Sequence, residues 1–496
     1  MASDQNRPNV IIIYTDDIGY GDLSCYGATN LQTKNIDKLA AEGLRFTQAH
    51  CPAATCTPSR YALLTGEYSW RKPGTGVARG DAPMIITPER YTLADMFKTD
   101  GYTTAVTGKW HLGLGAKDQQ DWNGLMTPGQ RDIGFDYSYI MAATGDRVPC
   151  VFMENDRISN LVPSDPIEVS YTTPFEGLPT GKNNPELLKV HPSHGHDQAI
   201  INGISRIGYM RGGNKALWVD ENIADSITVK AVKFIEKNHT KPFFLLFATN
   251  DIHVPRAPHP RFVGTTDMGP RGDAIVQMDW CVGQILTTLD KLHLRDNTII
   301  IFTSDNGPVV DDGYKDDAVE KLGGHTPSGG LRGGKYSKFE AGTKVPFIIR
   351  YPGKIKKGVS HALVSQIDMI SSLASLLKIS LPERSAPDSF DEWKSWSGKN
   401  TKGRKYVIEA TNSASLSVRT AQWKYIEPGS NAYKYDKYTN IELGNDTIDQ
   451  LYDLKSDPGE TKNLAIHRPD ILKEMTTLLK TIKESEATRF KEKIRK

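Results

Sequence analysis

Short runs of apolar and β-branched residues, alternating with amphipathic stretches, constrain the fold of this chain more than any other sequence feature. Four such runs predict strands, at Asn9–Thr15, Pro242–Thr249, Thr298–Thr303 and Val345–Arg350. Uninterrupted apolar runs of this length are typical of strands that are covered on both faces. Two amphipathic stretches predict helices, at Glu221–Asn238 and Asp273–Leu292. We therefore predict an α/β fold, with a large, mostly parallel mixed sheet sandwiched by helices.

The pattern changes near residue 403, which predicts two domains. Residues Lys405–Ala410 and Ser415–Glu427 resemble antiparallel strands, and Ile471–Ala487 resembles a final helix. We expect an N-terminal α/β domain over residues 1–402 and a smaller C-terminal α+β domain over residues 403–496. The segment Gly113–His196 is rich in Gly, Pro and Asp and has little periodicity, which favours long loops that carry recognition.

The charge balance of the chain argues against a nucleic-acid-binding protein. Lys plus Arg number 61 and Asp plus Glu number 59, for a formal net charge of +2. The apolar runs are each only one strand long, so we predict no transmembrane helix. We see no signal peptide at the N-terminus. This fits a cytosolic protein, and it also fits an exported protein whose signal peptide has been replaced. Five cysteines are too few for a disulfide scaffold.

Acidic side chains follow two of the predicted strands directly. Asp16 and Asp17 come after the first strand, and Asp305 and Asn306 come after the third. Ligands of open α/β sheets bind outside the carboxyl ends of the strands, so both pairs are expected to face one crevice. Their oxygens are hard ligands that suit Ca²⁺ or Mg²⁺. Either pair alone is more often a helix or turn cap, and the recurrence of the pattern favours a metal site.

The segment Cys56–Gly66 reads Cys-Thr-Pro-Ser-Arg-Tyr-Ala-Leu-Leu-Thr-Gly. Pro58 suits the first turn of a helix, which places Cys56 at the helix N-terminus, where anions are favoured. This segment resembles the signature of type I sulfatases, members of the alkaline phosphatase superfamily. Further similarity lies in Gly108–His111, His253, Gly333–Lys335 and Leu451–Leu464. The resemblance extends over almost the whole chain.

The resemblance implies an alkaline phosphatase-like fold and the hydrolysis of a sulfate monoester to an alcohol and inorganic sulfate. It implies that Cys56 is oxidised to formylglycine by a formylglycine-generating or anaerobic sulfatase-maturating enzyme. The expected ligands of one Ca²⁺, with Mg²⁺ as the alternative, are Asp16, Asp17, Cys56, Asp305 and Asn306. The expected catalytic set, with Cys56 as the nucleophile, also contains Arg60, Lys109, His111, His253 and Lys335. Such an enzyme is expected in the periplasm or outside the cell, with a cytoplasmic location as the alternative.

Several weaker signals concern the substrate. Asp146 and Arg147 are placed to bind sugar hydroxyls, Trp218 is a candidate to stack on a sugar, and His194 is a candidate contact. His191, His194, His196 and Asp197 have irregular spacing, so substrate contact or no role at all is favoured over zinc. The segments around Asp146 and His253 resemble bacterial carbohydrate sulfatases, which suggests an exo-acting enzyme on sulfated galactose or N-acetylgalactosamine. The alternatives are a phosphodiesterase or phosphonate monoester hydrolase of the same superfamily, and a non-catalytic protein that binds sulfated glycans.

Overall fold

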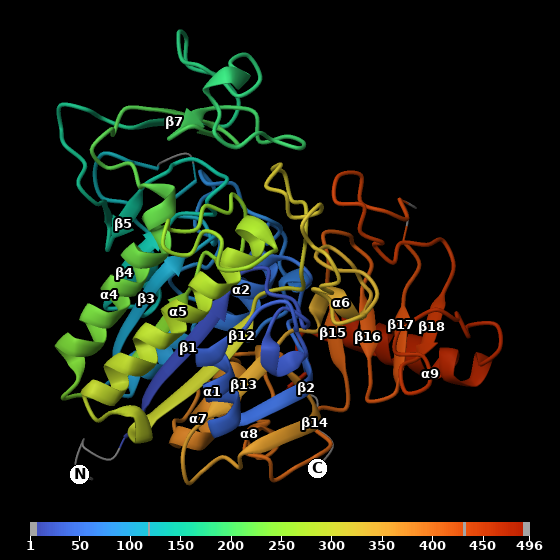
Figure 1. Cartoon of the computed structure of the whole chain (residues 1–496). Helices are drawn as coiled ribbons and strands as arrows, with labels where there is room; N and C mark the ends of the chain where they lie inside the picture. The colour runs from blue at the N-terminus through green and yellow to red at the C-terminus, as the bar shows by residue number, and fades with distance from the viewer. Residues whose placement is uncertain (1–6, 118–119, 430–432, 490–496) are drawn as a thin grey trace.

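A ten-stranded mixed sheet forms the centre of the protein in the computed structural model, which describes residues 7–117, 120–429 and 433–489 (Figure 1). In spatial order the strands are β14 (Gly358–Ser365), β2 (Leu44–His50), β13 (Phe347–Arg350), β12 (Thr298–Ser304), β1 (Asn9–Thr15), β11 (Phe243–Ala248), β3 (Thr103–Lys109), β4 (Tyr137–Met141), β5 (Phe152–Glu154) and β6 (Arg157–Ile158).

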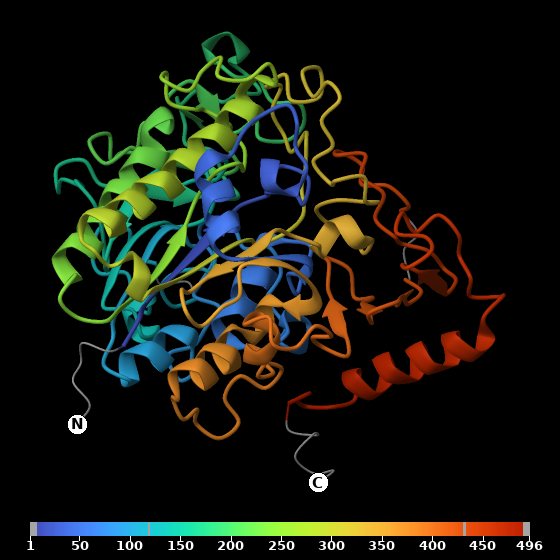
Figure 2. The same ribbon diagram turned by 60° about the horizontal axis from the view of Figure 1, so that its bottom comes forward.

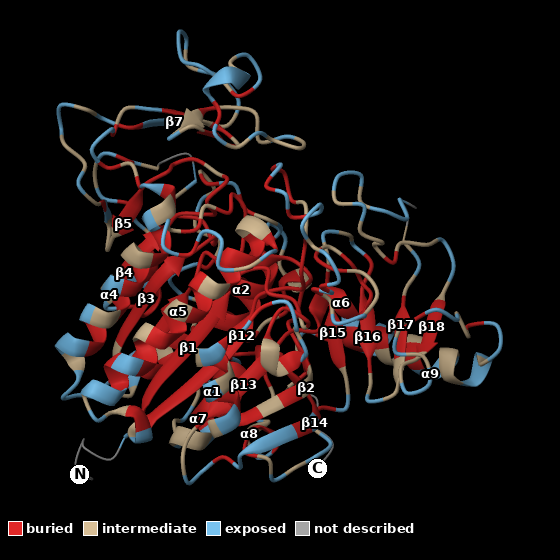
Figure 3. Cartoon of the chain, viewed as in Figure 1, coloured by how far each residue is buried: buried red, intermediate tan, exposed pale blue. Residues whose placement is uncertain are grey.

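The middle of this sheet is parallel and fully buried. Strands β12, β1, β11, β3 and β4 pair in parallel, whereas β13, β5 and β6 are antiparallel to their neighbours. Every residue of β1, β11 and β12 is buried, as the red central strands in Figure 3 show. The prediction of a mostly parallel mixed sheet is confirmed, because these apolar runs are covered on both faces.

Helices cover both faces of the sheet. Helices α1, α4 and α5 pack together on one face, and α2, α3 and α7 pack together on the other, as the two views in Figures 1 and 2 show. The helices are α1 (Lys34–Glu42), α2 (Cys56–Thr65), α3 (Leu93–Thr99), α4 (Ile223–Asn238), α5 (Gly269–Lys291), α6 (Glu340–Thr343), α7 (Met369–Leu377), α8 (Trp393–Trp396) and α9 (Pro469–Lys483). Among the residues that the structure describes, no helix combines the length and the apolar character needed to cross a bilayer. The five cysteines, all of them in the described ranges, are free thiols.

Irregular segments lie above the carboxyl ends of the central strands. They include the small pairs β7 (Glu168–Ser170) with β10 (Tyr209–Arg211) and β8 (Ile200–Ile201) with β9 (Ile204–Ser205). Figure 1 shows β7 at the top of the molecule, beyond the end of the sheet where β1 finishes. This segment is therefore placed to cover a site at the strand ends.

The C-terminal part forms a separate antiparallel sheet. Its strands are β15 (Val407–Glu409), β16 (Ser417–Arg419), β17 (Trp423–Ile426) and β18 (Gln450–Asp453). Helix α9 packs against β16 and β17. The predicted strands and final helix are thus present, with the predicted run Ser415–Glu427 divided into two strands by a turn.

A cluster of buried charges joins this C-terminal sheet to the rest of the protein. The buried charge cluster, as we call it, consists of His50, Glu340, Glu409, Arg419, Lys424 and Glu460. The Lys424 Nζ atom lies 2.8 Å from the Glu409 carboxylate and 3.3 Å from that of Glu340. It also lies 3.7 Å from the Glu460 carboxyl group, while the Arg419 guanidinium lies 3.3 Å from Glu340. The positive side chains of the C-terminal sheet therefore neutralise acidic groups contributed by both parts of the chain.

Candidate functional site

Parallel pairing of β1 with β12 brings the predicted acidic pairs together. Thr15 is in register with Ser304, so the residues that follow the two strands meet at one edge of the sheet. One oxygen from each of Asp16, Asp17 and Asp305 lies within 4.8 Å of the others, and all three side chains are buried. Asn306 Nδ2 donates to Asp17 at 2.7 Å. We call Asp16, Asp17, Asp305 and Asn306 the strand-end cluster.

Three buried cations surround the strand-end cluster. Lys109, the last residue of β3, contacts Asp16 and lies 3.9 Å from Asp305. Arg60 on α2 donates to Asp305 from Nε at 2.9 Å and from Nη2 at 2.7 Å. Lys335 lies 2.9 Å from Asp17. It belongs to a glycine-rich loop and directly follows Gly333 and Gly334. These three cations balance the three carboxylates of the cluster.

Helix α2 places Cys56 against His111. Cys56 is the first residue of α2, as predicted, and all ten residues of this helix are buried. The Cys56 Sγ atom lies 3.2 Å from His111 Nδ1, and His111 Nε2 lies 2.9 Å from the carbonyl oxygen of Ala78. Because a carbonyl can only accept, Nε2 carries the hydrogen, and the Nδ1 lone pair of a neutral His111 faces position 56. Burial, together with Lys109, lowers the pKa of His111 well below its usual range, which favours that neutral form.

His253 approaches the same cluster from the segment after β11. Its Nδ1 donates to the carbonyl oxygen of Val254 at 2.8 Å, so Nε2 faces Asp17 at 4.0 Å and Asp312 at 3.9 Å. Burial and the nearby Lys335 lower the pKa of His253 well below its usual range. Asp312 also accepts from Lys335 at 2.7 Å. The sequence analysis missed Asp312, whose only signal is an acidic residue shortly after Asp305 and Asn306.

The substrate candidates Asp146 and Arg147 lie beside His253. Asp146 Oδ1 lies 4.0 Å from His253 Nδ1, and Arg147 donates to Asp146 Oδ2 at 3.0 Å. His196, a member of the histidine group for which zinc was disfavoured, bonds Asp146 at 3.0 Å. His194 lies next to this group, with its ring 6.1 Å from that of His196.

Trp218 does not join this group. The side chain is 3% exposed and belongs to the hydrophobic core. Its indole N–H donates to Asp220 at 3.3 Å, and its ring packs on that of Phe152. This position gives no support to the predicted stacking of Trp218 on a sugar.

The strand-end cluster has the donor chemistry of a site for a hard cation. Asp16 Oδ1 and Asn306 Oδ1 are buried and accept no hydrogen bond, which is costly unless another group satisfies them. All the available ligand atoms at the ends of the two strands are oxygens, as Ca²⁺ and Mg²⁺ prefer. Among the described residues, the groups that could hold a metal do not include His191, His194, His196 or Asp197.

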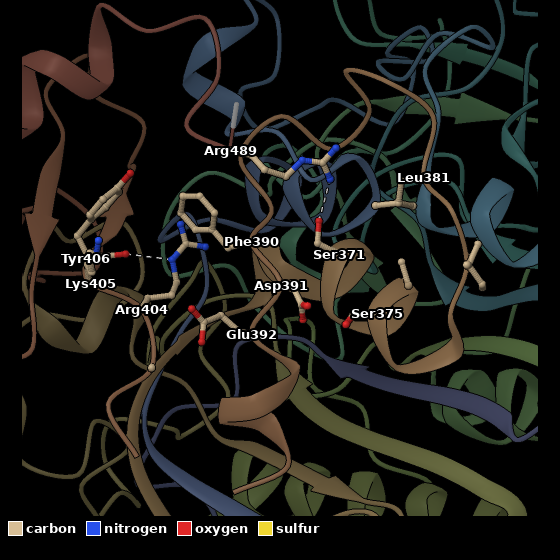
Figure 4. A pocket seen from close by; sticks show the side chains of 13 residues that line it. Ser371, Ser375, Leu381, Phe390, Asp391, Glu392, Arg404, Lys405, Tyr406 and Arg489 are labelled. Carbon is tan, nitrogen blue, oxygen red and sulfur yellow. Dashed lines mark hydrogen bonds between the residues drawn. The ribbon is translucent and has the colours of Figure 1, made fainter. Parts of the chain in front are cut away.

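A hollow of about 800 Å³ lies elsewhere, between α7 and the segment that leads into β15 (Figure 4). Phe390, Arg404 and Arg489 line it, and Arg489 donates to Ser371 at 3.0 Å. The lining described for it contains none of the predicted site residues.

The fold and the strand-end site define a class of hydrolases, and comparison with known proteins agrees. The family model named Sulfatase matches residues 8–379, and the model named N-sulphoglucosamine sulphohydrolase, C-terminal matches residues 334–487. The chain therefore belongs to the sulfatase family and is an enzyme that hydrolyses sulfate esters. The predicted family and reaction are confirmed. The alternative predictions, a phosphodiesterase or phosphonate monoester hydrolase and a non-catalytic glycan-binding protein, are not supported.

Individual members of the family and solved structures show how similar the chain is to characterised sulfatases. The chain is 53% identical over 482 residues to an N-acetylgalactosamine-6-O-sulfatase of Bacteroides thetaiotaomicron, covering 97% of this chain and 94% of the relative. It is 31% identical to human arylsulfatase A, covering 92% of this chain and 83% of the relative. A solved structure from work on the metabolism of multiple glycosaminoglycans by Bacteroides thetaiotaomicron matches with a TM-score of 0.95 at 53% identity, covering 97% of this chain and 100% of that one. A sulfatase from Pseudoalteromonas sp. shares the fold, with a TM-score of 0.71 at 24% identity, covering 98% of this chain and 92% of that one.

Proposed function

We propose that this sulfatase removes the 6-O-sulfate from N-acetylgalactosamine or galactose at the end of a sulfated glycosaminoglycan chain. The observation that carries the proposal is 53% identity to an N-acetylgalactosamine-6-O-sulfatase over nearly the full length of both chains. The predicted exo action on sulfated galactose or N-acetylgalactosamine is part of this proposal.

Asp146, Arg147 and His196 are the proposed contacts to the sugar. They form one hydrogen-bonded group directly beside His253. A paired carboxylate and guanidinium offers an acceptor and donors to neighbouring hydroxyls, and such charge-assisted hydrogen bonds are strong and directional. We include His194 as an outer contact, and we leave Trp218 out because it is buried in the core.

The proposed reaction starts at position 56. Conversion of Cys56 to formylglycine would supply a hydrated aldehyde whose hydroxyl group can attack sulfur. His111 faces this position with the lone pair of Nδ1, because its Nε2–H is held by the Ala78 carbonyl. His111 is therefore oriented to accept a proton at position 56, as a general base requires.

The remaining cluster residues are proposed to hold the metal and the sulfate group. Asp16, Asp17, Asp305, Asn306 and the converted Cys56 would hold one Ca²⁺, with Mg²⁺ as the alternative. The bound cation would supply positive charge that polarises the attacking and sulfate oxygens. The cationic side chains of the protein contact different residues of the strand-end cluster, and these contacts suggest a separate role for each.

Arg60 and Lys109 lie on the α2 and β3 side of the strand-end cluster, where they would orient the group at position 56. Lys335 and His253 lie next to Asp17, where they would bind the sulfate and protonate the leaving oxygen. His253 reaches that role through protonation of its free Nε2 when the sulfate ester monoanion arrives, because a nearby anion favours the charged imidazole.

The proposed biological setting follows from the substrate. Sulfated glycosaminoglycans are extracellular polymers, so we place the enzyme in the periplasm or outside the cell, with a formylglycine-generating or anaerobic sulfatase-maturating enzyme as its partner during synthesis. We also retain residues 1–402 and 403–496 as the proposed domains, since the antiparallel sheet begins shortly after, at Val407.

The test is a panel of sugars that differ only in the position of one sulfate. The enzyme is produced with and without a maturing enzyme, and the converted fraction of Cys56 is measured by peptide mass. Release of sulfate from 6-sulfated N-acetylgalactosamine or galactose should exceed release from the 4-sulfated isomers and should rise in proportion to the converted fraction. A preference for another position, or equal turnover by unconverted protein, would contradict the proposal.

A further inference from the structure

The C-terminal part contributes an exposed, aromatic and basic hairpin next to the proposed active site. We call residues 433–442 the aromatic hairpin; Tyr435 pairs with Glu442 across it. Three of its side chains are large and exposed, namely Tyr433 at 76%, Tyr435 at 48% and Tyr438 at 54%. Lys434 and Lys437 lie over the rings of Tyr435 and Tyr438, at 5.8 Å and 5.1 Å. Exposed aromatic side chains gathered in this way commonly mark a binding surface.

The aromatic hairpin is fixed to the loop that carries Lys335. Arg332 forms a two-pronged pair with Glu442, with both hydrogen bonds at 2.7 Å. Ser337 donates to the carbonyl oxygen of Glu442 at 2.6 Å, and the backbone N–H of Lys338 donates to the carbonyl oxygen of Leu443 at 3.0 Å. Figures 1 and 2 both show the orange-red loops of the C-terminal part beside the yellow loops that follow β12. The hairpin is therefore held in place at the edge of the site.

The tip of the hairpin also touches the proposed sugar-binding group. The Tyr438 ring stacks on the His194 ring, with centroids 4.7 Å apart and planes inclined by 11°. The ring of His194 is next to that of His196, which bonds Asp146. A continuous path of contacts thus runs from the position of the cleaved sugar to the exposed tyrosines. A glycan that extends beyond that sugar would pass along this path.

The charged side chains of the aromatic hairpin indicate which kind of ligand it would bind. Asp436 is engaged within the turn, where it accepts from Tyr438 and Thr439, and Glu442 is engaged by Arg332. Lys434 also pairs with Glu442, at 3.6 Å, so the hairpin presents its tyrosine rings together with the ammonium group of Lys437. Aromatic faces suit the apolar faces of sugars, and ammonium groups suit sulfate or carboxylate groups.

We propose that the aromatic hairpin is an outer subsite that binds the next acidic sugar of the glycan chain, with Tyr438 and Lys437 as its main contacts. The proposal rests on the function proposed above and adds that the enzyme prefers oligosaccharides to monosaccharides. The hairpin does not contact the strand-end cluster in any described interaction, so its effect should fall on KM for long substrates.

The test compares two substrates with the same 6-sulfated terminal sugar, one a monosaccharide and one a sulfated tetrasaccharide. Tyr438→Ala and Lys437→Ala should each lower the ratio of kcat/KM for the tetrasaccharide to that for the monosaccharide about fivefold, mainly through KM. Tyr438→Phe should keep the ratio, because it keeps the ring. Lys480→Ala removes an exposed lysine of α9, 76% exposed, and serves as the matched control for charge.

A second measurement separates this proposal from the proposed function. Binding of the tetrasaccharide to protein with unconverted Cys56 is measured by calorimetry at two salt concentrations. Tyr438→Ala should weaken binding about fivefold, and the effect of Lys437→Ala should shrink at high salt. An unchanged ratio together with unchanged binding would overturn the hairpin proposal, as would equal losses on both substrates. Failure of the wild-type enzyme to hydrolyse either substrate would overturn the proposed function, while weaker binding by the variants would still support the hairpin.

Discussion

Replacement of Lys424 by Met should destabilise the protein by about 3–5 kcal/mol, the usual cost of removing one partner from a buried ion pair. Lys424 is fully buried and faces three acidic groups, at 2.8, 3.3 and 3.7 Å. Burial and the neighbouring Glu340 raise the pKa of Glu460 to about 8, so Glu460 holds a proton at neutral pH. Glu340 and Glu409 are then the ionised carboxylates, and Lys424 and Arg419 balance them. Without Lys424, one buried negative charge is left uncompensated.

The assay is urea unfolding, followed by a signal from the C-terminal sheet. Lys483→Met is the matched control, since Lys483 pairs with Glu427 at 2.9 Å but is 40% exposed, and it should cost at most about 1 kcal/mol. The double variant Lys424→Met with Glu409→Gln should regain part of the loss, with a coupling of about 0.5–3 kcal/mol. A loss from Lys424→Met that is no larger than that of the control would refute the reasoning.

Three further results are expected. The folded protein keeps a proton on Glu460 that the unfolded chain releases above its ordinary pKa of 4.5, so the free energy of unfolding should fall as the pH rises from 4.5 toward 8. In urea unfolding, Glu460→Gln should flatten this dependence on pH. An unchanged slope in the variant would contradict the reasoning. His253→Ala should slow hydrolysis of sugar sulfates by about 10²–10⁴-fold but affect nitrophenyl sulfate much less, because a stable leaving oxyanion needs little protonation; equal losses would remove His253 from this role. Exhaustive chelation should lower both activity and unfolding temperature, since a cation bound only to the folded state stabilises it; full activity with a metal-free protein, checked by elemental analysis, would exclude a required metal.

The sequence predicts the parts of the site that depend on strands and helices. Asp16 and Asp305 could be placed together because each follows a buried apolar strand, and parallel strands end at one edge of the sheet. Cys56 could be placed at a helix start because Pro58 suits the first turn. These rules are local, so they operate without knowledge of the tertiary structure.

The loop residues follow no such rule. Asp312 is recognisable only once the structure shows its hydrogen bond to Lys335, and His196 only through its bond to Asp146. Trp218, a candidate to stack on a sugar, instead lies in the hydrophobic core against Phe152. The contact between Tyr438 and His194 joins loops that are far apart in the sequence, which no pattern within either loop could indicate.

The burial of α2 has a consequence for the biosynthesis of the enzyme. Cys56 is 2% exposed, and every residue of its helix is enclosed by the fold. The folded protein therefore shields this thiol from a modifying enzyme. The conversion of Cys56 that we propose would therefore have to precede the completion of folding, because folding encloses the thiol. The specific activity of a preparation should accordingly report how fast the nascent chain was modified, not how much maturing enzyme was added afterwards.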